Sequence, residues 1–119
     1  MSWRNYPESQ LAALTRPPSF SEDQSERLCP ACGNMTVRQY VYLSYERQRP
    51  AIIGYVWCRS CQHFAGSVGP APGGLVFSDP FQDLDDDQRL DMEEDLGVFF
   101  GRLDQCWDDG ALPQRFGDQ

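Results

Sequence analysis

The chain has 119 residues, a length that suits one compact domain with short tails better than two independent cores. Hydrophobic residues make up 40% and aromatic residues 13% of the sequence, so a disordered chain is excluded. The longest apolar run, residues 51–58, has eight residues and falls far short of the roughly 18 that a membrane-spanning helix needs. The first residues lack the apolar core of a secretory signal, and we therefore expect a cytoplasmic protein that does not contact membranes.

The formal net charge of −8 is unevenly distributed along the chain. Residues 27–64 carry +4, whereas residues 79–109 carry −10. Because phosphate is repelled by the acidic segment, we do not expect the whole surface to enclose a nucleic acid. Acidic helices keep small proteins in solution, and they also attract basic partners; the charge pattern leaves both interpretations open.

Residues 7–15 are predicted to form a short N-terminal helix with a thin apolar face from Leu11 and Leu14. Residues 35–45 and 51–57 are rich in β-branched and aromatic side chains and predict two strands. These strands are joined by a polar turn, so we expect a β-hairpin. Short strands are also predicted at residues 63–68 and 75–77.

The strand over residues 35–45 alternates between two kinds of side chain. Its odd positions include Val37 and Val41, and its even positions carry Arg38, Tyr40 and Tyr42. If the even positions face solvent, rings and guanidinium groups alternate on an open surface. If they face the remaining elements, the tyrosines pack beneath a helix or the tail.

The clearest element is an amphipathic helix predicted over residues 85–107, about 35 Å long at 1.5 Å per residue. Apolar side chains recur along it at steps of three and four, on one stripe made of Met92, Leu96, Phe99, Phe100, Leu103 and Trp107. Asp79 before Pro80 also resembles a helix start, upstream of the start at residues 85–87. Gly110 is expected to end the helix.

Two cysteine pairs carry the chemistry of this sequence: Cys29 with Cys32, and Cys58 with Cys61. Two residues between the cysteines of a pair let both sulfurs bind the same tetrahedral ion. The predicted hairpin then brings the second pair beside the first. Because four thiolates complete the coordination sphere, no position is left for an activated water, and we expect one structural Zn²⁺ ion.

The Cys-Pro-Ala-Cys-Gly sequence at 29–33, the hairpin and the Cys-Arg-Ser-Cys sequence at 58–61 together resemble a zinc ribbon. The resemblance covers about residues 27–68. It implies a fold module used in transcription factors, polymerase subunits, ribosomal proteins and protein-docking modules, not a particular activity.

The predicted fold class is therefore α+β. It combines a zinc-ribbon hairpin or three-stranded antiparallel sheet with a short N-terminal helix and a long C-terminal amphipathic helix. Within one compact domain, we expect four segments: an N-terminal helix and linker at 1–26, the ribbon at 27–78, the acidic helix at 79–110 and a tail at 111–119.

Other interpretations of the cysteines are less consistent with the sequence. A redox-active pair begins a helix, but extended sequence follows both pairs here. Disulfides are disfavoured in a protein with no sign of secretion. An iron–sulfur cluster is chemically possible with four cysteines. His63, the single histidine, offers a replacement ligand or lies alone on the surface, and Cys106 is expected to be a small apolar residue beside the helix stripe.

We expect a non-enzymatic protein-interaction module with no small-molecule substrate, because the sequence contains no recognisable set of catalytic groups. One version is an acidic inhibitor of the immunity or antitoxin type that covers a basic partner. The alternative is a nucleic-acid-binding ribbon. Its contacts would come from the strand and the turn that follows it, through Arg38, Tyr40, Tyr42, Arg47 and Arg49.

Overall fold

The computed structural model describes residues 3–16, 22–44, 50–71 and 73–117. In chain order the elements are β1 (Arg4–Asn5), α1 (Glu8–Leu14), β2 (Arg27–Leu28), β3 (Met35–Ser44), β4 (Ala51–Cys58), β5 (His63–Pro70), β6 (Val76–Phe77), α2 (Asp86–Glu93), α3 (Leu96–Asp109) and β7 (Phe116–Gly117). The α+β class is thus confirmed.

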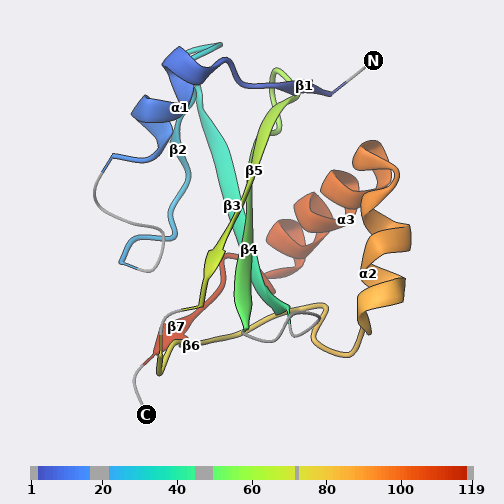
Figure 1. The fold of residues 1–119 in the computed structure, drawn as a ribbon. Coiled ribbons are helices and arrows are strands. Elements are labelled where there is room, and N and C mark those ends of the chain that lie inside the picture. The colour runs from blue at the N-terminus through green and yellow to red at the C-terminus, as the bar shows by residue number, and fades with distance from the viewer. Residues whose placement is uncertain (1–2, 17–21, 45–49, 72, 118–119) are drawn as a thin grey trace.

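Five strands form the main sheet, in the order β1-β5-β4-β3-β2 (Figure 1). Strands β3, β4 and β5 are the long antiparallel centre, where Tyr40 pairs with Tyr55 and Tyr55 with Gly66. Strand β1 lies parallel to β5 at one edge, and the short β2 lies antiparallel to β3 at the other. The strands predicted at 35–45, 51–57 and 63–68 are present as β3, β4 and β5, and β1 and β2 extend the sheet. Residue 45 and most of the predicted turn that follows it lie outside the described residues.

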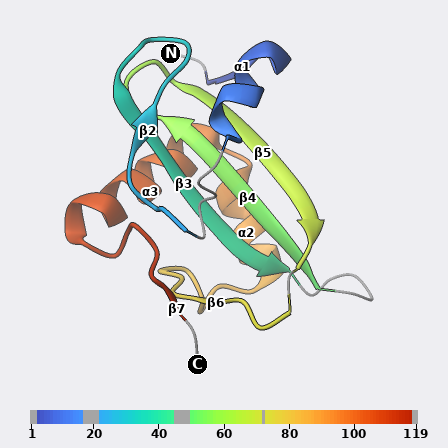
Figure 2. The same cartoon turned by 90° about the vertical axis from the view of Figure 1, so that its left-hand side faces the viewer.

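Helices cover the two faces of this sheet unequally: α2 and α3 lie on one face and α1 lies on the other (Figures 1 and 2). The larger core forms beneath α3, where Trp57 of β4 stacks on Phe100 at 5.5 Å between ring centroids. A second, smaller core lies on the α1 side; its buried residues are Tyr6, Leu14, Cys29, Val37 and Cys58. The two faces therefore have separate cores divided by the strands.

The prediction of a single helix over residues 85–107 is wrong, because the structure has two helices in this segment, α2 and α3. Asp85 caps α2 together with Gln88, in a reciprocal pair of hydrogen bonds between side chain and backbone. Asp95 has an extended backbone conformation and its side chain accepts a hydrogen bond from the Val98 N–H, so a second helix starts at this point. Gly110 ends α3 with a φ of 86°, as expected for a left-handed cap.

The strand predicted at 75–77 does not join the main sheet. It forms β6, which pairs with β7 in a separate two-stranded sheet. Gln114, just before β7, binds the free edge of β3: its amide accepts from the Val41 N–H at 2.9 Å and donates to the Val41 carbonyl at 2.8 Å. Among the described residues, no helix is long and apolar enough to cross a membrane.

Candidate metal centre

The two cysteine pairs form matching turns at one end of the sheet. The first turn precedes β3, and the second connects β4 to β5. In each turn, the carbonyl oxygen of the first cysteine accepts a hydrogen bond from the backbone N–H of the residue four positions later. Gly33 donates to Cys29 at 2.8 Å, and Gln62 donates to Cys58 at 3.1 Å. Gly33 and Gln62 both adopt positive φ, of 78° and 62°. Gln62 is the one non-glycine residue with positive φ in the described part of the chain.

The four sulfur atoms all lie within 4.8 Å of one another. The sulfurs of Cys29 and Cys61 are 3.6 Å apart, and those of Cys32 and Cys58 are 3.7 Å apart. A tetrahedral ion with metal–sulfur bonds of about 2.3 Å holds its sulfurs about 3.8 Å apart. Both distances exceed the roughly 2.05 Å of a disulfide, and all four cysteines are free thiols here. The residues present thus fit a single tetrahedral metal ion.

Each of the four sulfurs also has one polar side chain beside it. The Tyr6 hydroxyl lies 3.0 Å from the Cys29 sulfur, and the Thr36 hydroxyl lies 3.0 Å from the Cys58 sulfur. The more exposed pair has longer contacts, which are Asn34 Nδ2 to Cys32 at 3.5 Å and His63 Nδ1 to Cys61 at 3.2 Å. Donors around a group of thiolates disperse its negative charge and fix the orientation of the sulfurs.

The electrostatic surroundings of Cys58 favour the thiolate, the form that binds metals. Burial raises the pKa of this thiol. Hydrogen bonds from the Thr36 hydroxyl and from the N–H groups of Cys61 and Ser60 lower it by more, so that the pKa is about 7. Burial raises the pKa of Cys61. The cluster therefore includes one thiol that ionises more readily than an ordinary cysteine.

His63 and Cys106 lie outside the set of four sulfurs. His63 is half-buried at the start of β5, with its ring 5.2 Å from that of Tyr6, so it is not a lone surface residue. It contacts the Cys61 sulfur but does not replace any of the four cysteines in the cluster. Cys106 lies on α3 and packs against the larger core, as the helix pattern predicted.

The even side of β3 does not form the exposed surface that nucleic-acid stacking requires. Arg38, Tyr40 and Tyr42 are 8%, 0% and 4% exposed, because they face the helical layer. Arg38 donates to Glu26 and to Asp104, and its guanidinium lies over the Trp107 ring. The packing interpretation of the tyrosines is the correct one. Arg47 and Arg49 lie outside the described residues.

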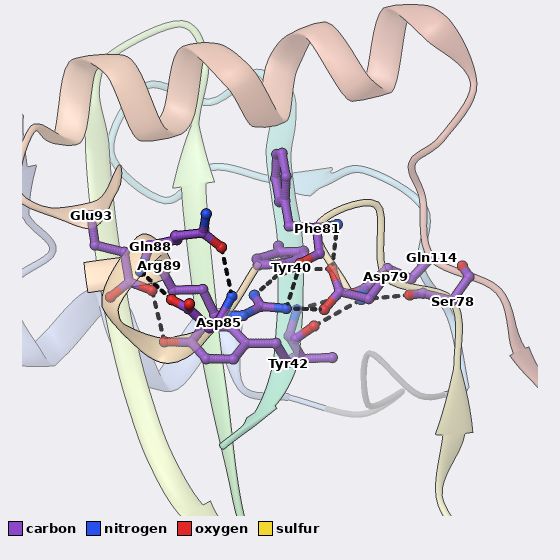
Figure 3. A network of polar contacts seen from close by, with 11 residues as sticks. Tyr40, Tyr42, Ser78, Asp79, Phe81, Asp85, Gln88, Arg89, Glu93 and Gln114 are labelled. Atoms are coloured by element: carbon purple, nitrogen blue, oxygen red, sulfur yellow. Dashed lines mark hydrogen bonds and ion pairs between the residues drawn. The ribbon is translucent and has the colours of Figure 1, made fainter. Parts of the chain in front are cut away.

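A buried polar network holds these tyrosines, and sequence reasoning missed it (Figure 3). Arg89 of α2 donates to Asp79 at 2.7 Å and to the Tyr40 hydroxyl at 2.8 Å, while the same hydroxyl donates to Asp79 at 2.6 Å. Glu93 accepts hydrogen bonds from Tyr42 and Tyr55. Asp79 therefore anchors a buried cation and does not begin a helix. The one signal in the sequence was an arginine within an otherwise acidic helical segment.

The fold and the site together define a mixed α+β protein with four clustered cysteines, an arrangement consistent with a zinc-binding module. Comparison of the chain with protein-family models, with curated proteins and with solved structures found no match.

Proposed function

We propose that the protein binds one structural Zn²⁺ ion through Cys29, Cys32, Cys58 and Cys61 and acts as a non-enzymatic, zinc-ribbon-type module that binds a basic protein partner. The observation that carries the metal assignment is the set of four sulfurs within 4.8 Å. On an iron–sulfur cluster, the cysteines bind different iron atoms and some sulfurs lie farther apart than on a single ion. Four thiolates are the donor set of structural zinc, and they leave no open position for a reacting water.

The helical layer supports the binding of a basic partner. Eight acidic side chains from this layer and the loop before it are exposed, namely Asp83, Asp85, Asp87, Asp91, Glu94, Asp95, Asp108 and Asp109. Two apolar side chains lie exposed among them, Leu90 at 53% and Val98 at 49%. Exposed apolar side chains contribute to protein interfaces, and the negative charge around them favours a partner of opposite sign. An inhibitor of the immunity type is one protein that would work in this way.

Metal analysis of the purified chain tests the first half of the proposal. We expect about one equivalent of zinc in the wild type. Cys58→Ser should lose the metal and fall sharply in soluble yield, whereas Cys106→Ser, a cysteine outside the cluster, should keep both. Far less than one equivalent of zinc in wild-type protein prepared without chelators would contradict the metal assignment. A comparable content of iron and sulfide would show that the site binds an iron–sulfur cluster in place of zinc.

A charge-neutralising variant tests the partner surface. Asp87→Asn, Asp91→Asn and Glu94→Gln together remove three charges around Leu90. The matched control, Glu8→Gln with Glu22→Gln and Asp23→Asn, removes three exposed charges from outside the helical layer. In affinity capture from native lysate, the wild type and the control should retain the same basic protein, and the helical variant should lose about tenfold. Equal retention by both variants, or recovery of nucleic acid alone, would refute this surface.

A further inference from the structure

A cavity of about 260 Å³ lies on the face of the sheet opposite α2 and α3, between helix α1 and strands β3, β4 and β5. Figure 2 shows α1 lying over this face. The register of the strands defines the floor as two rows, which are Gln39–Val56–Ala65 and Val41–Gly54–Ser67. Leu11 and Leu14 of α1 form a wall. None of the four clustered cysteines lines the cavity, although Leu11, Leu14, Val56 and Ala65 belong to the same small core as these cysteines.

Gly54 keeps the floor hollow. A Cβ atom at this position would lie 3.1 Å from the Ser67 hydroxyl oxygen and 3.3 Å from a Val41 methyl carbon, closer than ordinary contact. Any larger residue would fill the space above its row. The centre of a sheet otherwise disfavours glycine, which lacks a side chain to pack against its neighbours.

Gln39 supplies an unsatisfied polar group in this apolar setting. It is 7% exposed, and neither its amide oxygen nor its amide nitrogen has a hydrogen-bond partner among the described residues. It lies midway between Val37 and Val41 on β3, so its side chain is on the α1 side of the sheet. Buried amides in folded proteins are normally paired, and an unpaired one requires an explanation. Because this amide holds no hydrogen bond, it can turn toward a ligand without breaking one.

The chemistry of the lining selects the class of ligand. A glutamine amide offers one donor and one acceptor side by side, which another amide matches with two hydrogen bonds. Arg27, at the margin, donates to the carbonyl oxygens of Leu14 and Asp23, so its N–H groups are engaged. A cavity of roughly 150 Å³ holds benzene, so one of this volume takes about ten non-hydrogen atoms.

We propose that this cavity is a binding site for a small neutral ligand that combines an apolar ring or chain with a carboxamide or lactam group. The Gln39 amide binds that group through two hydrogen bonds. The site uses other residues than the proposed zinc and partner-binding sites, and its wall, α1, packs on the same small core as the cysteines. It departs from the sequence-based expectation that the protein takes no small molecule.

Binding of benzamide to the full-length, metal-loaded chain tests the proposal, with toluene and benzoate as comparison probes. In titrations followed by the backbone amide NMR signals, benzamide should bind in the millimolar range and shift residues such as Leu14, Val56 and Ala65. Toluene and benzoate should bind at least about tenfold more weakly, because neither satisfies both atoms of the Gln39 amide. Equal or tighter binding of either one would overturn the amide assignment.

Two variants locate the site. Gln39→Met conserves size but removes both polar atoms, so benzamide should bind about tenfold more weakly while toluene binding is unchanged. Gly54→Val should abolish binding of both probes by filling the floor. Undiminished benzamide binding by Gln39→Met, or the absence of any shift around the cavity in the wild type, would overturn the proposal even if Gly54→Val fails to fold.

Discussion

The Asp79–Arg89 pair shows how much a single buried charge depends on its partner. The side chains are only 11% and 7% exposed, and the guanidinium also lies 4.3 Å from the centre of the Tyr42 ring. Burial and the neighbouring Asp79 charge raise the pKa of the Tyr40 phenol, so Tyr40 remains a neutral donor to Asp79. Arg89 thus has one carboxylate to balance it in a site with little water.

Asp79→Asn is predicted to lower the free energy of unfolding by about 3 kcal/mol, because it leaves the buried Arg89 charge unbalanced. Urea denaturation measures this change, and Asp83→Asn, an exposed aspartate in the same loop, serves as the control with an effect below about 0.5 kcal/mol. The double variant Asp79→Asn with Arg89→Met should recover part of the loss. Equal stability of Asp79→Asn and Asp83→Asn would mean that the Asp79–Arg89 pair does not stabilise this loop.

At the scale of the elements, two glycines in α3 have different surroundings. A Cβ at Gly97 would lie 3.3 Å from Oδ1 of Asp95, the N-cap of the same helix, and 3.9 Å from the ring nitrogen of Trp3, which is ordinary contact. In the described part of the chain, a Cβ at Gly101 would meet nothing within 4 Å, and the residue is exposed. Gly101 therefore weakens the helix without a packing reason.

Gly101→Ala is predicted to raise the free energy of unfolding by about 1 kcal/mol, because alanine loses less backbone entropy in a helix. Thermal melts followed by circular dichroism would show this as an increase of a few degrees in Tm. Gly97→Ala is the matched comparison and should give a smaller gain, since its methyl group meets the Asp95 cap. A drop in Tm for Gly101→Ala would show that this face of α3 is covered.

The elements that could be predicted from the sequence are those with local signals. The strand periodicity of β3 and β4, the cysteine spacing and the Gly110 cap each depend on neighbouring residues, and all agree with the structure. The break at Asp95 was missed because the apolar stripe continues across it into α3. The sequence also did not show which face of β3 is covered. Alternation shows that the two faces differ, but the covered face is determined by the aromatic residues of α3, which lie far along the chain.

At the scale of the whole molecule, the four-cysteine cluster and the helical layer belong to different cores. Tyr6 connects β1 and α1 to the cluster through its contact with Cys29, and its backbone N–H bonds to Phe64 of β5. The small core on this side buries few apolar side chains apart from the cysteines themselves. The aromatic core beneath α3 contains Trp57, Phe99 and Phe100 and needs no metal to bury them.

Metal removal is therefore predicted to loosen one side of the protein before the other. A structural zinc ion supplies on the order of 10 kcal/mol to zinc-finger domains. At the proposed site, that energy would act where the small core meets the two cysteine turns. After chelation, hydrogen–deuterium exchange should accelerate at least about tenfold in β1, α1 and the two turns, while α3 stays protected by its aromatic packing. Restoring one equivalent of zinc should reverse the change. If α3 lost its protection at the same chelator concentration and rate as α1, the two cores would form one cooperative unit, and the metal would stabilise the entire fold.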